Sequence, residues 1–325
     1  MSTVLEIKDL HIEYHTDSDV VHAVNGLTLS LDESETLGLV GETGAGKTST
    51  ALGVLRLLPE PQGVISRGDI LFGGESILQK SRSEMRAIRG KQISMIFQDP
   101  MTALNPIMTV GDQIAEVVRL HDKCSRADAV RRAQEMLELV GIPGERYKDY
   151  PHQFSGGMKQ RVVIAISLAC NPRILIADEP TTALDVTIQA QVLKLMRELR
   201  QKFSTSTLLI THDLGVVAEM CDHVAIIYCG EVVEYGTMQD VFDRPSHPYT
   251  VGLFGSIPDL ESRAERLVPI PGTVPDPAHL PEGCRFANRC PHRCARCEAE
   301  HPDDTALGGV HRVRCFYPLT GKEDA

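Results

Sequence analysis

The residues with the clearest chemistry form a glycine-rich turn near the start of the chain, Gly41–Thr48. This turn fits G-x-x-x-x-G-K-T and follows an apolar, strand-like run, "TLGLV", which is the context that a phosphate-binding loop needs. Glycines let backbone N–H groups approach phosphate oxygens, and a helix N-terminus adds its dipole. Lys47 supplies positive charge to the β- and γ-phosphates, and the Thr48 hydroxyl is suited to Mg²⁺. The predicted nucleotide contacts here are Gly41, Glu42, Thr43, Gly44, Ala45, Gly46, Lys47, Thr48 and Ser49.

A second segment, "RILIADEPTTALD" (173–185), carries two carboxylates at the end of a predicted strand. Ile174–Ala177 is continuously apolar, which is typical of a buried parallel strand. Asp178 is placed to hold Mg²⁺ directly or through water. Glu179 follows at the carboxyl end, where it can orient or deprotonate an attacking water. An acidic pair at a strand exit is often only a solvated turn, but its combination with Gly41–Thr48 favours the catalytic interpretation.

A third segment, "FSGGMKQR" (154–161), directly precedes an apolar helical stretch at 160–172. Ser155, Gly156 and Gly157 are therefore expected at a helix N-terminus, which is a second anion-binding site in the same chain. The phosphate loop already serves one side of a nucleotide. The second site is useful if a partner chain presents it across the γ-phosphate, so the sequence favours a nucleotide shared between two chains.

In this order, the three segments resemble the ATP-binding cassette (ABC) family, in which the phosphate loop of one subunit faces the signature segment of another. The resemblance implies an α/β P-loop NTPase fold with a RecA-like core, an antiparallel β-subdomain and a helical subdomain. It also implies ATP and Mg²⁺ as ligands and ATP hydrolysis as the activity. Met158 departs from the family, which usually has glutamine there. Ser155 and both glycines are retained, so we expect an active site.

The resemblance extends to four further positions. Tyr14, which ends "LEIKDLHIEY", matches the aromatic residue that stacks on adenine, and Gln98 in "MIFQDP" matches the glutamine that senses the γ-phosphate. Thr182–Asp185 matches the loop that crosses the dimer interface, and His212, after "TLLIT", matches the switch histidine. The expected catalytic residues are Glu179, His212 and Gln98. The expected magnesium ligands are Thr48, Gln98 and Asp178.

Patterning divides the chain into a cassette at 1–236 and an extension at 237–325. Residues 1–97 are rich in predicted strands, with "AVNGLTLSLDESE" predicted as a hairpin that leads into the phosphate loop. Two amphipathic segments, "TVGDQIAEVVRL" and "SRADAVRRAQEMLELVGI", predict a helical subdomain over about 99–155. Residues 156–236 return to alternating helices and parallel strands. Proline and turn-forming residues beyond 237 predict a loop-dominated extension.

The extension carries three ordered motifs, "HPYT…GL…SIP", "IPGTVPDP" and "GCRFANRCP". Together they resemble the C-terminal region of the ATPases of bacterial oligopeptide and dipeptide importers. The resemblance implies a second ABC ATPase subunit, expected to form a heterodimer with this chain. It also implies two transmembrane permeases and an extracytoplasmic substrate-binding protein. The chain would then lie at the cytoplasmic face of the inner membrane as a peripheral subunit.

Two alternatives stay open at this stage. Relatives of this kind also handle nickel, glutathione-like peptides and some oligosaccharides, so the solute is not fixed by the sequence. A regulatory ABC ATPase without a transport role is the second alternative, because some cassette ATPases act outside membranes. Both alternatives keep ATP hydrolysis and differ only in what the hydrolysis drives.

Composition and charge limit the classes of partner that are expected for the chain. The start, "MSTVLEIKDL", has charged residues among its apolar ones and is not expected to be a signal peptide. The longest apolar run, residues 162–170, is shorter than the roughly 20 residues that span a bilayer. The net charge of −11 disfavours a nucleic-acid-binding surface. We therefore expect no nucleic-acid partner.

Five of the nine cysteines lie within residues 284–315. In a reducing compartment, clustered thiols are more often metal ligands than disulfides, and a chance surplus is the third interpretation. Zinc has a claim, because "CARC" (294–297) is a C-x₂-C pair and three histidines lie nearby in the sequence. These histidines are His292, His301 and His311.

The importer ATPases that the extension resembles imply a different ligand set. Some of them bind a 4Fe–4S cluster through a C-x₅-C-x₆-C-x₁₇-C pattern, and four thiolates are what such a cluster requires. The matching residues are Cys284, Cys290, Cys297 and Cys315, and Cys294 falls outside the pattern. We expect a structural staple in a loop-rich metal-cluster segment, with Zn²⁺ as the alternative metal.

Overall fold

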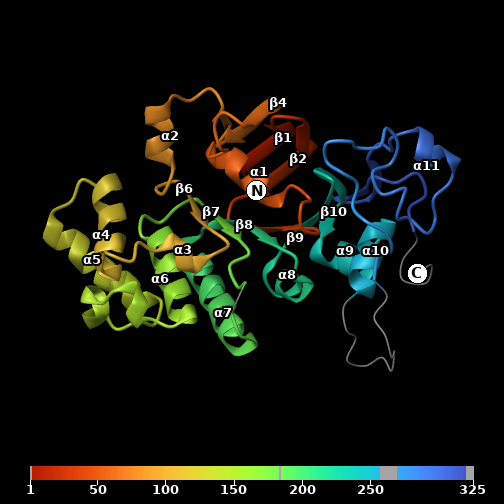
Figure 1. Ribbon diagram of the computed structural model, residues 1–325. Coiled ribbons are helices and arrows are strands. Elements are labelled where there is room, and N and C mark those ends of the chain that lie inside the picture. Colours follow the sequence, from red (N-terminus) through yellow and green to blue (C-terminus); the bar gives the residue numbers. More distant parts are fainter. Residues whose placement is uncertain (1, 183, 257–268, 320–325) are drawn as a thin grey trace. The chain divides into compact units, whose positions relative to one another are not determined.

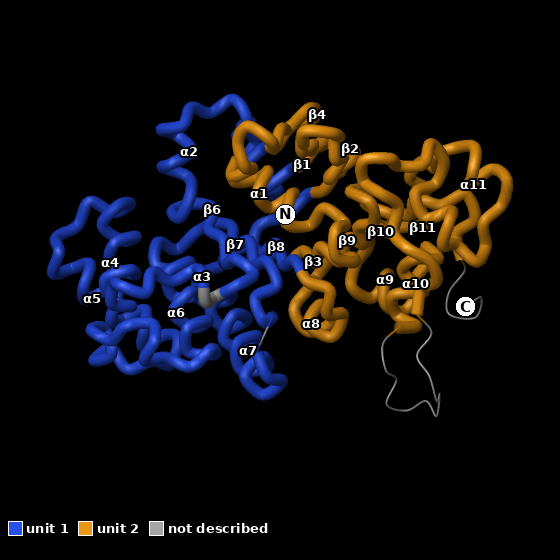
Figure 2. Tube along the Cα trace, viewed as in Figure 1, with its two compact units in different colours: residues 1–6, 30–36, 71–210 blue, residues 7–29, 37–70, 211–325 orange. Residues whose placement is uncertain are grey.

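A computed structural model describes residues 2–182, 184–256 and 269–319 (Figure 1). The chain divides into two compact units, each built from several segments (Figure 2). Unit 1 contains residues 1–6, 30–36 and 71–210, and unit 2 contains residues 7–29, 37–70 and 211–325. The predicted division at residue 236 stays a prediction. Ala183 of the predicted interface loop and the end of the "HPYT…GL…SIP" motif, residues 257–258, lie outside the described residues.

Unit 1 contains three parallel strands, β6 (Ile93–Ile96), β7 (Ile174–Asp178) and β8 (Ser206–Thr211). Strand β7 pairs with both of the others, and all five of its residues are buried. A parallel strand covered on both faces needs continuously apolar residues, which explains the run that predicted it. Helices α6 (Gly156–Leu168) and α7 (Val186–Phe203) belong to the same unit. The remaining elements here are β5 (Glu75–Ser76) and α2 (Arg82–Ile88).

The predicted helical stretch of unit 1 contains α4 (Val110–His121) and α5 (Arg126–Leu139), which confirms both amphipathic helices. Each begins after a hydroxyl N-cap: Thr109 accepts from the Asp112 N–H and Ser125 accepts from the Asp128 N–H. Such caps satisfy backbone donors that the first turn leaves without a partner. Three short helices complete this stretch: α3 (Pro100–Ala103), η1 (Gly144–Lys148) and η2 (Pro151–Gln153).

Unit 2 contains the strands around the phosphate loop. Strand β3 (Thr36–Val40) pairs in parallel with β9 (His223–Tyr228), and β10 (Glu231–Thr237) pairs antiparallel with β9. Helix α1 (Lys47–Leu55) follows β3, and α8 (Leu214–Met220) precedes β9. A second sheet has the order β2-β1-β4-β5. Its long strands are β1 (Thr3–His15), β2 (Val20–Asp32) and β4 (Gly63–Phe72).

The hairpin predicted at residues 23–35 is wrong, because Ala23–Asp32 lie in one continuous strand, β2. Within this strand, the Asn25–Gly26 pair has a structural role. The Asn25 side-chain amide donates to the Cys229 carbonyl at 2.8 Å, and its backbone N–H donates to the Gly230 carbonyl at 2.8 Å. Gly26 has φ +71°, a value that glycine adopts without strain. The pair therefore fastens β2 to the turn between β9 and β10.

The extension contains more regular structure than its composition predicted. Strand β12 (His311–Val313) pairs antiparallel with β10, and β11 (Thr305–Gly308) pairs with β12. Its described residues also form the helices α9 (Met238–Asp243), α10 (Pro248–Gly255) and α11 (Ala295–Ala299). Among the described residues, no helix combines the length and the apolar character that a membrane span requires.

Candidate active site

The phosphate loop connects β3 to α1 and is shaped by close backbone contacts. A Cβ atom on Gly41 would lie 2.2 Å from the Ile227 carbonyl oxygen, and one on Gly46 would lie 2.3 Å from the Ala23 carbonyl oxygen. Gly46 also has φ +97° and directly precedes Lys47, the first residue of α1. Neither position has room for a side chain, so the glycines at both ends of the motif are required by packing as well as by ligand approach.

Lys47 is buried within the loop. Its Nζ donates to the Gly41 carbonyl at 2.7 Å and to the Glu42 carbonyl at 2.9 Å. Thr43, Gly44 and Thr48 are exposed, as a loop that receives phosphates from solvent must be. The ammonium group therefore lies inside a turn whose outer residues are accessible to a ligand.

Tyr14 is brought to the start of α1, as the nucleotide interpretation requires. Its hydroxyl donates to the Ser49 Oγ at 3.1 Å. The aromatic ring of β1 thus lies beside the first turn of the helix that follows the phosphate loop. Both residues were predicted nucleotide contacts, and the structure places them side by side.

Glu179 is held in a strained and well-oriented position at the end of β7. Its φ is +47°, an uncommon value for a residue other than glycine that often accompanies function. Its carboxylate accepts from Gln98 Nε2 at 2.9 Å and from the Thr182 hydroxyl at 2.9 Å. Asp178 beside it is buried. The structure therefore brings together Gln98, Glu179 and Thr182, which the sequence placed in three separate motifs.

The signature segment caps helix α6, as predicted. Ser155 is the N-cap and accepts from the Met158 N–H at 3.4 Å. Its two glycines differ in their surroundings. A Cβ on Gly157 would lie 2.4 Å from Ile188 Cγ2, whereas the nearest atom to a Cβ on Gly156 belongs to Leu184 at 4.0 Å. Gly157 is thus required for the packing of α6 on α7, a role that the sequence did not indicate.

The predicted nucleotide residues form two sets, one in each unit. Unit 2 contains Tyr14, Gly41–Ser49 and His212, which is exposed after β8. Unit 1 contains Gln98, Ser155–Gly157, Asp178 and Glu179.

The four cysteines of the predicted cluster pattern line a common pocket of unit 2. The lining includes Cys284, Cys290, Cys297 and Cys315 together with His292, but not Cys294. Burial raises the pKa of Cys284, Cys290 and Cys315 to about 11 each. All nine cysteines are free thiols, so the structure contains none of the disulfides that were considered.

A single metal ion has no ready site here. Within the described part of the chain, no three His, Cys, Asp or Glu side chains are grouped closely enough to hold one ion. Two of the histidines considered for zinc bind buried carboxylates instead: His301 Nε2 lies 2.8 Å from a Glu231 oxygen, and His311 Nε2 lies 2.9 Å from a Glu234 oxygen.

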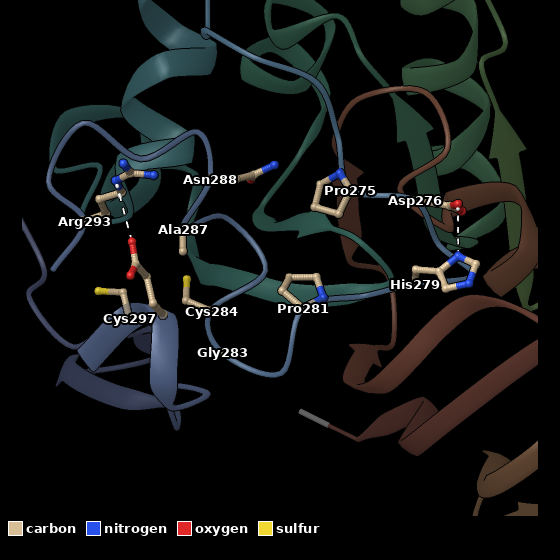
Figure 3. A pocket seen from close by; sticks show the side chains of 11 residues that line it. Pro275, Asp276, His279, Pro281, Gly283, Cys284, Ala287, Asn288, Arg293 and Cys297 are labelled. Atoms are coloured by element: carbon tan, nitrogen blue, oxygen red, sulfur yellow. Dashed lines mark hydrogen bonds and ion pairs between the residues drawn. The ribbon is translucent and has the colours of Figure 1, made fainter. Parts of the chain in front are cut away.

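A separate pocket of about 420 Å³ lies beside the cysteines (Figure 3). It shares Cys284 and Cys297 with the thiol-lined pocket. An Asp276–His279 pair (3.2 Å) and an Arg293–Glu298 pair (3.9 Å) lie along its wall. Each of these four side chains therefore already has a partner within the pocket wall.

Sequence reasoning missed contacts from the extension to the phosphate loop, which are made by Tyr249 and Arg289. Arg289, next to Cys290, is 5% exposed and binds the Glu42 carboxylate through both terminal nitrogens, at 2.6 and 3.1 Å. The two residues are 247 positions apart, so no local pattern could have linked them. The sequence shows only that a loop-rich, cysteine-containing segment has an arginine, and it does not indicate what that arginine binds.

Comparison with known proteins decides the family. Residues 24–182 match the family model of the ABC transporter, and residues 233–297 match that of the oligopeptide/dipeptide transporter C-terminal region. The chain is 51% identical to the dipeptide transport ATP-binding protein DppD of Bacillus subtilis (strain 168), over 97% of this chain and 95% of that protein. The chain belongs to the oligopeptide/dipeptide family of ABC transporter ATP-binding subunits. It is 48% identical to the oligopeptide transport ATP-binding protein OppD of Escherichia coli (strain K12), over 97% of this chain and 94% of that one.

A solved structure supports the cassette fold. The chain superimposes with a TM-score of 0.65 and 27% identity on cbiO1 of Clostridium perfringens, part of the ABC transporter complex cbiONQ, covering 74% of this chain and 91% of that one. The predicted α/β P-loop cassette, ATP binding and ATPase activity are confirmed by membership of the family.

Proposed function

We propose that this chain hydrolyses ATP to drive the uptake of dipeptides or oligopeptides across the cytoplasmic membrane. The observation that carries the proposal is the combination of a cassette with the specialised extension at 233–297, in a chain 51% identical to a dipeptide transport subunit along nearly its whole length. Nickel, glutathione-like peptides and oligosaccharides are the competing solutes. The proposed partners are a second, different ABC ATPase, two permeases and an extracytoplasmic binding protein.

The proposed chemistry begins at the phosphate loop. Backbone N–H groups of Gly41–Thr48 would cradle the phosphates, and Lys47 would neutralise charge on the β- and γ-phosphates. Tyr14, held beside Ser49, would stack on adenine. Thr48, Asp178 and Gln98 would hold Mg²⁺, which supplies electrostatic stabilisation of the phosphoryl oxygens when bound.

Glu179 is the proposed general base. Two donors, the Gln98 amide and the Thr182 hydroxyl, fix its carboxylate at 2.9 Å each, so that it needs little reorganisation to orient a water. In the proposed heterodimer, His212 would contact the γ-phosphate of the ATP bound to this chain, and the partner's signature segment would complete that site. Ser155–Gly157 of this chain would contact the ATP bound to the partner. An isolated monomer is then expected to hydrolyse ATP slowly.

The test is uptake by proteoliposomes that contain the permeases, both ATPases and the binding protein. We expect a labelled dipeptide to accumulate with ATP, and labelled nickel or oligosaccharide not to accumulate. In the matched Glu179→Gln complex we expect ATP binding without dipeptide uptake. Accumulation of nickel but no peptide would overturn the proposed solute, and full uptake with this chain as the sole ATPase would overturn the heterodimer.

For the extension we propose a 4Fe–4S cluster held by Cys284, Cys290, Cys297 and Cys315. The residues fit such a group because the four thiols, and not Cys294, line one pocket. When bound, the cluster would cross-link four positions of a loop-rich segment. Chain purified without oxygen should then be brown and contain about four irons and four sulfides.

Serine variants separate the cluster from zinc. Serine at any of the four proposed ligands should remove the colour, while the matched Cys294→Ser variant should keep it. A colourless chain with stoichiometric zinc that depends on Cys294 would contradict the cluster and restore the zinc alternative.

A further inference from the structure

Every polar group of Glu42, inside the phosphate loop, is bound by other residues of unit 2. Its N–H donates to the Tyr249 hydroxyl at 2.9 Å, and its carbonyl accepts from Lys47 Nζ at 2.9 Å. Its carboxylate accepts from both terminal nitrogens of Arg289, at 2.6 and 3.1 Å. Two of these three partners, Tyr249 and Arg289, belong to the extension and not to the loop or its flanking strands. The extension therefore binds a residue whose own carbonyl positions Lys47.

Arg289 is itself rigidly held. Its Nε donates to the Pro271 carbonyl at 3.0 Å, and Nη1 also lies 3.4 Å from the Tyr228 hydroxyl. Its guanidinium carbon lies 5.8 Å from the Tyr228 ring centre and 5.9 Å from that of Phe286. A side chain that is already held by such contacts loses less entropy when its guanidinium binds a carboxylate. The bidentate pair with Glu42 raises the pKa of Arg289, so this side chain stays charged.

The pair also reaches the strand beneath the loop. Tyr228 follows Ile227, whose carbonyl oxygen lies 2.2 Å from where a Cβ on Gly41 would be. The Tyr228 ring contacts those of Tyr249 and Phe286, with centroid separations of 4.6 and 5.3 Å. Arg289 therefore binds Glu42 of the loop and also contacts Tyr228, whose neighbour Ile227 lies against Gly41.

From these contacts we propose that Arg289 is a positioning residue for ATP binding and hydrolysis. It fixes Glu42, and through the Glu42 carbonyl it fixes Lys47, in the geometry that receives phosphates. The extension is then a working part of the nucleotide site. This inference rests on the proposed phosphate-binding role of Gly41–Thr48 and does not depend on a metal cluster.

The test measures ATP affinity of the full-length chain, by titration with a fluorescent ATP analogue and Mg²⁺, and the KM for ATP in the assembled transporter. Arg289→Met removes the charge and the hydrogen-bond donors and keeps an unbranched, flexible side chain. We expect it to raise both constants at least tenfold. The matched control is Arg293→Met in the same segment, whose 57%-exposed side chain pairs only with Glu298, at 3.9 Å; it should change neither constant by more than twofold.

A double-mutant cycle isolates the pair. Glu42→Gln should weaken ATP binding as much as Arg289→Met does, and the double variant should bind no more weakly than either single one. A purely structural role would lower the amount of active protein and leave the dissociation constant and KM unchanged. If Arg289→Met does not fold, Arg289→Lys decides the question, with an expected rise of about threefold because one of the two hydrogen bonds is kept.

The outcomes separate this inference from the proposed function. If Lys47→Ala abolishes nucleotide binding while the Arg289 variants stay within twofold of the parent chain, the positioning role is wrong and the phosphate loop stands. If the effects of Arg289→Met and Glu42→Gln multiply in the double variant, the two residues act independently and the inference is overturned. If Lys47→Ala binds ATP normally, the proposed phosphate site itself is wrong.

Discussion

The phosphate loop and the segment at 269–319 both lie in unit 2, but different interactions fix their shapes. The loop is set by backbone against backbone, with glycines at Gly41 and Gly46 where a Cβ would lie within 2.3 Å of a carbonyl oxygen. The segment is set by side chains, above all by two buried carboxylates on β10, Glu231 and Glu234. A shape that depends on the local backbone can be predicted from a short motif, whereas the contacts between side chains that are distant in the sequence cannot.

The carboxylates show how the segment is attached. Glu234 accepts from the N–H groups of Ser246 and His247, at 2.8 and 2.9 Å, and pairs with His311 at 2.9 Å. Glu231 pairs with His301 at 2.8 Å. Buried carboxylates are costly unless such partners are complete. The extension therefore supplies the hydrogen-bond partners that the two buried carboxylates of β10 need, so β10 and the extension stabilise each other.

Adding a side chain at Gly41 should have the largest effect, which is a loss of ATP affinity. Gly41→Ala would place a Cβ 2.2 Å from the Ile227 carbonyl oxygen, and backbone atoms cannot move aside as side chains do. We expect ATP affinity to fall at least a hundredfold, measured by nucleotide titration. The matched control is Gly255→Ala, where an added Cβ meets nothing within 4 Å. Normal ATP binding by Gly41→Ala would show that the loop is not shaped by its backbone.

Glu234, the buried carboxylate that joins the extension to β10, should affect stability even when the chemical change is smaller. Glu234→Gln keeps the shape but places an amide N–H₂ against N–H donors, which leaves buried groups without partners. We expect a loss of about 2–4 kcal/mol of stability, measured by calorimetric unfolding. Glu300→Gln is the control, since its side chain is 59% exposed and pairs with Arg296. Equal stability of the two variants would remove Glu234 as the anchor.

The two glycines of the signature segment allow a tightly packed position to be compared with an open one within unit 1. Gly157→Ala would bring a Cβ to 2.4 Å from Ile188 Cγ2, and overpacking of this kind costs about 1–3 kcal/mol. Gly156→Ala has 4.0 Å to its nearest neighbour and should leave the melting temperature unchanged or slightly raised. A larger loss of stability in Gly156→Ala than in Gly157→Ala would contradict these positions.

The smallest expected effect is the contribution of His121 to the pH dependence of stability. Burial and the nearby Lys91 ammonium lower the pKa of His121 below 6.5. The unfolded chain therefore binds more protons than the folded one as pH falls through 6.5, so stability is present above that pH and is lost toward acid. We expect His121 to account for less than about 1 kcal/mol between pH 7 and pH 5. His121→Gln should flatten the pH dependence of the melting temperature by that amount, and a steeper dependence would contradict the shift.

The sequence predicted the features that local patterns control. Strand β7 follows from a continuous apolar run and helices α4 and α5 follow from their periodicity, because a buried strand and an amphipathic helix each impose their own spacing. The hairpin predicted at residues 23–35 does not form, because Ala23–Asp32 continue as one strand that long-range hydrogen bonds join to Cys229 and Gly230. Strands β11 and β12 are too short to stand out, and they form because β10 is there to pair with.

At the candidate active site too, local patterns predicted individual residues but not the contacts between residues that are distant in the sequence. Glu179 was predicted, but its positive φ and its contacts with Gln98 and Thr182 follow from the tertiary fold. The Arg289–Glu42 pair joins residues 247 positions apart, and nothing in either neighbourhood of the sequence indicates the other.

The dependence of the loop on the extension can be measured directly by amide hydrogen exchange of residues 41–46 in the full-length chain. We expect Arg289→Met to speed exchange in these residues at least tenfold, with strands β3 and β9 unchanged and with Arg293→Met matching the parent chain. Exchange at 41–46 that is the same in all three proteins would contradict the account, because the loop would then keep its shape without the extension.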